Sequence, residues 1–220
     1  MPTPPLRLLL LLVVLIALAT FIQLGAVTIA FDKLGLSPES ALLLLFTMLI
    51  GSMINLPLFS MAADEPPPSE LPPPLRQLFG TRRMPFTGRT VVAANVGGCV
   101  TPVAFCIYLL LHNPLNPLQV LVAVALVSLV SHSSSRLVPG LGIGIPMLIA
   151  PLTAAFVAIA LNPQQSAPLA YICGTLGVLI GADILRLKDI KKLGAPIASI
   201  GGAGTFDGIF ITGIVAVLLA

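Results

Sequence analysis

Residues 167–185 read APLAYICGTLGVLIGADIL. The run is predominantly apolar, and its single charged residue, Asp183, stands near its end. A helix needs about 20 mostly apolar residues to cross the hydrocarbon core of a bilayer. The stretch therefore predicts a membrane-spanning helix with an ionisable side chain close to one end.

Further apolar runs lie on both sides of this stretch. The seven candidate spans cover residues 7–30, 41–62, 90–111, 117–134, 141–161, 168–186 and 197–220. With 57% hydrophobic and 9% charged residues, the chain is far more apolar than a soluble domain, of which about a quarter is charged. We expect one all-α transmembrane domain over residues 1–220, a polytopic bundle of about seven spans in which glycine and proline interrupt several helices. Residues 63–89 are expected to form a proline-rich cytoplasmic loop.

The basic residues indicate an orientation. If seven spans alternate, ten of the eleven lysines and arginines fall on one face, and only Lys33 falls on the other. Basic residues in short loops tend to stay in the cytoplasm, so we expect the N-terminus inside and the C-terminus outside a prokaryotic cell membrane. The first span exceeds the usual apolar region of a signal peptide, about 7–15 residues, which favours a retained helix over a cleaved leader.

The net charge of +3 does not indicate a nucleic-acid partner. The basic residues stand in short loops between apolar runs, where lipid head groups are the expected neighbours. The lipid bilayer is therefore the one partner that the composition predicts. The oligomeric state stays open.

Polar residues and helix breakers gather in the cytoplasmic half of this topology. Backbone that departs from a helix at membrane depth must satisfy its polar groups against protein or water, so it is tolerated where it lines a cavity. We therefore expect a cytoplasm-facing pocket. Its expected lining residues are Asn55, Asn95, Gly97, Gly98, Gly201, Gly202, Gly204 and Thr205.

Asp183 and Asp207 are the carboxylates expected within the bilayer. An ionisable side chain costs several kcal/mol there unless it is paired or hydrated, so each is a candidate functional residue. Asp207 lies deeper and is the stronger candidate, while Asp183 could instead pair with Arg186 or Lys188 at the membrane boundary. If the two aspartates meet, they share a proton, and this is the arrangement with which aspartyl proteases activate water.

Four runs resemble an uncharacterised family of bacterial and archaeal integral membrane proteins. They are GSMINLPL (51–58), SSRLVPGLGIGIPMLIAP (134–151), APLAYICGTLGVLIGADILRL (167–187) and LGAPIASIGGAGTFDGIFITG (193–213). The resemblance covers nearly the whole chain and implies a polytopic membrane protein without an established activity.

A weaker resemblance is to the intramembrane aspartyl proteases of the presenilin and signal peptide peptidase type. The order and direction of Asp183 and Asp207 are similar to those of the catalytic pair in that class, which implies that these two residues would be catalytic. Two positions depart from its motifs: Ala182 stands where the class has tyrosine, and Phe206 replaces the second glycine of GxGD.

Three functions remain open at this stage. An aspartyl protease-like hydrolase would use Asp183 and Asp207 as acid and base against a membrane peptide. A proton-coupled transporter would bind a small solute between broken helices and protonate Asp207. A non-catalytic scaffold would use the aspartates only to hold helices together. The sequence contains no metal-binding or nucleotide-binding motif, so we expect no metal and no cofactor.

Overall fold

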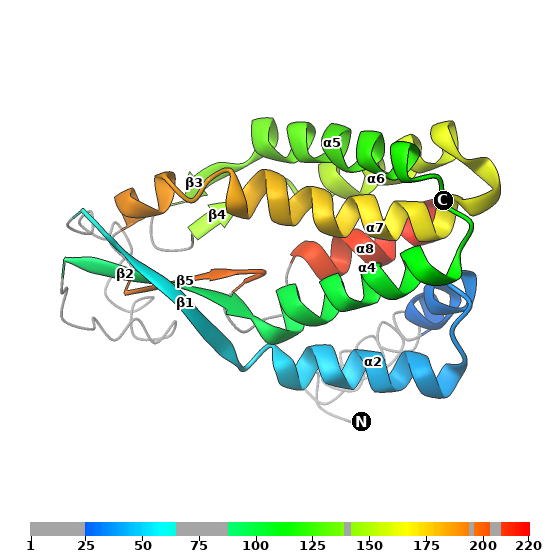
Figure 1. Cartoon of the computed structure of the whole chain (residues 1–220), viewed down its shortest axis with the longest axis horizontal. Helices are drawn as coiled ribbons and strands as arrows, with labels where there is room; N and C mark the ends of the chain where they lie inside the picture. The colour runs from blue at the N-terminus through cyan, green and yellow to red at the C-terminus, as the bar shows by residue number, and fades with distance from the viewer. Residues whose placement is uncertain (1–24, 65–87, 139–141, 194–195, 203–207) are drawn as a thin grey trace, which may run out of the picture.

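The computed structural model describes residues 25–64, 88–138, 142–193, 196–202 and 208–220. Its helices form a bundle around α7 (Ser166–Val178), which lies against α4 (Thr101–His112), α5 (Pro117–Ser134), α6 (Ile149–Leu161) and α8 (Gly208–Leu219) (Figure 1). Eleven of the thirteen residues of α7 are buried, which makes it the core helix of the bundle.

Two helices of the described chain are long and apolar enough to cross a membrane. They are α5 and the continuous helix Pro163–Ile184, which contains α7. A third candidate is the bent pair formed by Gly25–Lys33 and α2 (Pro38–Gly51), whose axes meet at 111°. The structure therefore supports a mostly helical membrane protein with two or three candidate spans.

Cap and proline pairs in the sequence mark where helical segments begin. An asparagine or serine side chain accepts a hydrogen bond from a first-turn backbone N–H, and the following proline lacks the N–H that would otherwise be left without a partner. The pairs are Ser37–Pro38, Asn116–Pro117 and Asn162–Pro163.

The expectation of a purely helical chain is wrong at one end of the bundle, where three predicted spans contain strands. These strands are β1 (Asn55–Ala62), β2 (Arg89–Asn95) and β5 (Ile197–Ile200). They form a sheet in the order β1-β2-β5, with β1 antiparallel and β5 parallel to β2. The sheet lies beyond the ends of the helices (Figure 1).

Local chemistry explains why these segments leave the helical state. Pro57 cannot continue a helix because it lacks an N–H and clashes with the preceding turn, whereas the edge strand β1 accommodates it. Val91 and Val92 are β-branched and suit the central strand. Pro196 and Gly201 bound β5 on either side and limit it to four residues.

A second, two-stranded sheet pairs β3 (Arg136–Val138) with β4 (Gly142–Gly144) in antiparallel fashion. Strand β4 lies where the fifth span, residues 141–161, is expected to begin, and β3 lies in the connection before that span. The helical part of that span, α6, is correspondingly short, with 13 residues.

The seam between α5 and α7 is closed by small residues. A Cβ atom on Gly177 would lie 2.6 Å from Cβ of Val127, and one on Gly181 would lie 2.3 Å from the backbone oxygen of Ser128. Glycines at these positions let the two helices approach closely, as expected where membrane helices pack through small residues.

Candidate functional site

Asn95 joins three segments at the sheet end of the bundle. It ends β2, it is 1% exposed, and its Oδ1 accepts a hydrogen bond of 2.8 Å from the backbone N–H of Gly98. Its Nδ2 donates to the backbone oxygen of Ser52 at 2.7 Å and to Oδ1 of Asn55 at 3.1 Å. The end of α2, strand β1 and the turn after β2 are thereby held around one buried amide.

The turn after β2 is a short π-helix, η1 (Val96–Val100), whose glycines allow backbone-to-backbone contact. A Cβ atom on Gly97 would lie 1.9 Å from the backbone oxygen of Met48, and one on Gly98 would lie 1.9 Å from that of Gly201. Neither position has room for a side chain. These two contacts press η1 against α2 on one side and against the end of β5 on the other.

Asp183 reaches the same place from the core helix. It lies in a second π-helix, η3 (Leu179–Ile184), which continues α7. The half-buried carboxylate accepts a hydrogen bond of 2.8 Å through Oδ2 from the backbone N–H of Gly201. Gly201 and Gly202 have φ values of 82° and 86°, which favour glycine, and this turn follows β5 directly.

Ser199 is a member of the site that the sequence interpretation missed. Its hydroxyl donates a hydrogen bond to Oδ1 of Asn55, which links β5 to β1 across the sheet. The sequence carried one usable signal, because Ser199 is the polar residue of the short apolar strand before the paired glycines. We name the assembled cluster the polar node; its members are Asn55, Asn95, Gly97, Gly98, Asp183, Ser199 and Gly201.

Most of the predicted site residues are therefore brought together. The predictions for Gly204, Thr205 and Asp207 lie outside the described residues, and Gly202 directly follows the polar node in the chain. The two π-helices that converge here are a rare form that is frequent at functional sites. The pocket expected at this position stays a prediction.

One interpretation of Asp183 was an ion pair with Arg186, but the Arg186 side chain binds other groups. Its guanidinium forms an ion pair of 3.2 Å with Asp189. It also donates to the backbone oxygens of His132 and Ser135, both at 2.8 Å, where α5 ends. Hydrogen bonds from Lys192 and Arg186 hold the pKa of Asp189 below its ordinary value. Arg186 thus anchors the end of α5 beside the node.

The node combines groups that suit both proton transfer and backbone recognition. Asp183 can bind or release a proton, and it lies beside a glycine turn in which Gly201 is buried and Gly202 is half-buried. In the described part of the chain, β5 pairs with β2 along one edge and with no strand along the other. A free strand edge presents N–H and C=O groups to an extended segment.

Apolar helices packed around α7, with a short sheet and a polar node at one end of the bundle, define the class of this chain, a mostly helical membrane protein. The chain belongs to the family described as "Protein of unknown function (DUF1614)", whose profile matches residues 49–219. This confirms the expected membership of an uncharacterised family. No curated protein and no solved structure matches the chain. The resemblance to presenilin-type proteases gains no support from these comparisons.

Proposed function

We propose that the polar node belongs to the active site of a membrane-embedded, aspartyl protease-like hydrolase. The observation that carries the proposal is the hydrogen bond of 2.8 Å from the Gly201 N–H to the Asp183 carboxylate. It joins the helix that bears the first aspartate to the glycine turn that leads, six residues later, to Asp207. Asp183 and Asp207 would then form the catalytic pair.

In the proposed reaction, the two carboxylates share one proton at the start. The ionised aspartate takes a proton from a water molecule as its oxygen attacks the peptide carbonyl, and the protonated aspartate donates its proton to the carbonyl oxygen. Collapse of the tetrahedral intermediate breaks the C–N bond, and the amine leaves with a proton from the pair. Water is the only co-reactant.

The edge of β5 that pairs with no other described strand supports an extended peptide as the substrate. A transmembrane helix must unwind before its backbone can be attacked, and its freed N–H and C=O groups then need partners within the membrane. Strand addition to β5 would supply such partners. The same strand ends at Gly201, so the added segment would pass beside Asp183.

The proposal is tested with single-span reporter peptides that carry a central glycine–proline pair, reconstituted with the full-length protein in liposomes. Mass spectrometry should detect cleavage by the wild type, and Asp183→Asn and Asp207→Asn should each abolish it. Asp189→Asn, which removes a carboxylate outside the node, should leave cleavage intact. Cleavage that persists in both Asp183→Asn and Asp207→Asn would rule the hydrolase out.

A test without substrate examines the shared proton. Infrared difference spectra of a coupled pair should contain a protonated carboxyl band at neutral pH, because two adjacent carboxylates share one proton. That band should disappear or shift in both Asp183→Asn and Asp207→Asn. A spectrum of Asp183 that does not respond to Asp207→Asn would contradict the pair.

A proton-coupled transporter is the second candidate, favoured by the meeting of the two π-helices η1 and η3 at the node. Discontinuous helices near the bilayer midplane form solute sites in secondary transporters. Solute uptake into liposomes that depends on a pH gradient and is lost in Asp207→Asn would favour this function. A scaffold would instead tolerate asparagine at both positions in every assay.

We further propose seven crossings of a prokaryotic cell membrane, with the N-terminus and the polar node on the cytoplasmic side. The positive charges of the loops support this orientation. Labelling of single introduced cysteines by a membrane-impermeant reagent in intact cells tests it. A cysteine at Asp64, beside the node end, should be protected, and one at Asn116, at the opposite helix ends, should react.

A further inference from the structure

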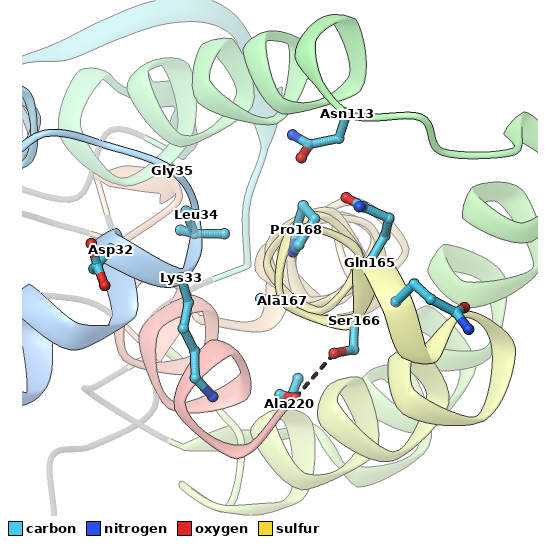
Figure 2. A pocket seen from close by; sticks show the side chains of 11 residues that line it. Asp32, Lys33, Leu34, Gly35, Asn113, Gln165, Ser166, Ala167, Pro168 and Ala220 are labelled. Atoms are coloured by element: carbon cyan, nitrogen blue, oxygen red, sulfur yellow. Dashed lines mark hydrogen bonds between the residues drawn. The ribbon is translucent and has the colours of Figure 1, made fainter.

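A pocket of about 420 Å³ opens at the end of the bundle opposite the polar node. It surrounds the first turn of α7 (Figure 2), whereas Asp183 lies 17 residues further along that helix, about 25 Å away at 1.5 Å per residue. The polar residues that line it are Asp32, Lys33, Asn113, Gln164, Gln165 and Ser166. They come from three segments that are far apart in the sequence.

The two charges in this pocket differ in how they are held. The ammonium group of Lys33 donates to the backbone oxygens of Val217 and Leu218, at 3.3 and 3.2 Å, and so lies over the end of α8. Its side chain extends toward Ala220 (Figure 2). Asp32 stands on the same turn, and within the described residues its carboxylate forms no ion pair or hydrogen bond. A carboxylate is thus available to a cationic group.

The opposite wall offers uncharged donors and acceptors. Across the described ranges, the carboxamides of Gln164 and Gln165 are not engaged with other protein side chains. The oxygen of the Asn113 carboxamide is also available, since only its Nδ2 donates, to the backbone oxygen of Leu109. Lys33 adds a third ammonium proton beyond the two that the α8 carbonyls accept.

These groups fit a ligand that carries both signs of charge. A ligand ammonium would pair with Asp32 and could donate to the oxygen of Asn113, and a ligand carboxylate would accept hydrogen bonds from Lys33 and from the carboxamide N–H groups of Gln164 and Gln165. The volume of about 420 Å³ lies within the range of small-molecule sites, about 300–1,000 Å³.

We propose that this pocket is a binding site for a small zwitterionic solute of the free amino-acid class. The site is separate from the polar node and does not depend on the hydrolase proposed there.

The test is isothermal titration of the purified full-length protein in detergent micelles with glycine, L-alanine and L-glutamine as probes. Acetate and methylammonium serve as the two half-molecules. At least one amino acid should bind saturably and about tenfold tighter than either half-molecule, because two charge-assisted contacts act together. Asp32→Asn should weaken that binding about tenfold, since it removes the charge and keeps the shape of the side chain.

Two controls separate this site from the node. Asp64→Asn removes an exposed carboxylate at the sheet end, and Asp183→Asn removes the node carboxylate; both should leave amino-acid binding unchanged. The proposal is overturned if none of the three amino acids binds, if acetate binds as tightly as they do, or if Asp32→Asn has no effect. Loss of binding in Asp183→Asn would instead assign the solute to the node. None of these results depends on peptide cleavage.

Discussion

The two ends of the core helix are built on different principles. At the Asp183 end, main-chain atoms of Gly98 and Gly201 touch, and a buried amide is hydrogen-bonded on all sides. At the Ser166 end, long polar side chains surround an open pocket. Backbone contact tolerates no added atom, whereas flexible side chains can move aside. Substitutions that add atoms should therefore be tolerated less well at the node than at the pocket.

The largest expected difference between the two ends concerns two glycines with positive φ. A Cβ atom on Gly201 (φ 82°) would lie 2.5 Å from the backbone carbon of Gly98, whereas one on Gly35 (φ 76°), at the pocket, has nothing within 4 Å. Gly201→Ala should cost about 3–5 kcal/mol, the sum of backbone strain and overpacking. Gly35→Ala should cost about 1–2 kcal/mol, the strain alone. Denaturation in detergent micelles measures both.

Equal losses of unfolding free energy in Gly201→Ala and Gly35→Ala would contradict the close approach at the node. In that case, the positive φ would explain both effects without any contact. Gly25→Ala provides a further control, because Gly25 lies in a helix and has no atom within 4 Å of the added Cβ. Its substitution should be neutral or slightly stabilising.

The asparagines at the two ends provide the second test. Asn95→Leu leaves the Gly98 N–H and the Ser52 oxygen without this partner and removes one of the two hydrogen bonds that Oδ1 of Asn55 accepts, so it should cost about 3 kcal/mol of unfolding free energy. Asn113→Leu removes one half-exposed hydrogen bond to Leu109 and should cost about 1 kcal/mol. A milder loss in Asn95→Leu than in Asn113→Leu would mean that the node is not what holds the sheet to the bundle.

Much of the node could be predicted from the sequence, and for a physical reason. Asparagines and paired glycines are rare in membrane helices unless backbone must bend or approach closely, so Asn55, Asn95, Gly97, Gly98 and Gly201 stood out. The convergence of these residues follows from one rule, that irregular backbone is tolerated where other protein groups satisfy it. The sequence thus predicts which residues gather at the node, but not the hydrogen bonds among them.

The sheet could not be predicted, because its strands lie inside continuous apolar runs. A buried strand and a buried helix have the same hydrophobicity, and only length and breakers separate them. Pro57 and Pro196 were the available signals. The contacts of Arg186 with Asp189 and with the end of α5 could not be predicted either, since they depend on where α5 ends in space relative to η3.

The third test compares two cations that cover helix ends. Arg186 donates to two backbone oxygens at the end of α5 and pairs with Asp189, while Lys33 donates to two at the end of α8. Arg186→Met should cost about 2 kcal/mol, because it uncovers carbonyls in a half-buried position. Lys33→Met should cost about 1 kcal/mol or less, since its head is solvent-exposed. If Lys33→Met lost more unfolding free energy than Arg186→Met, the node end would not be the more tightly held end of the bundle.

The smallest expected effect is a pH dependence beside the node. Hydrogen bonds from Lys192 and Arg186 lower the pKa of Asp189 from its ordinary value of 3.8 in the folded protein. The folded state therefore gains stability from this carboxylate above pH 3.8 and loses it as the pH falls through the lowered folded pKa. The side chain is 28% exposed and pairs with an exposed lysine, so solvent screens the interaction; the gain should stay below about 0.5 kcal/mol and shrink with added salt.

Asp189→Asn isolates this contribution from those of the other carboxylates. Unfolding free energies of the wild type and Asp189→Asn, measured in a buffer series from neutral pH to below 3.8, should differ most at neutral pH and converge in acid. A constant difference between wild type and Asp189→Asn would mean that the carboxylate acts through packing rather than charge. The ion pair would then hold Arg186 in place without contributing charge-dependent stability.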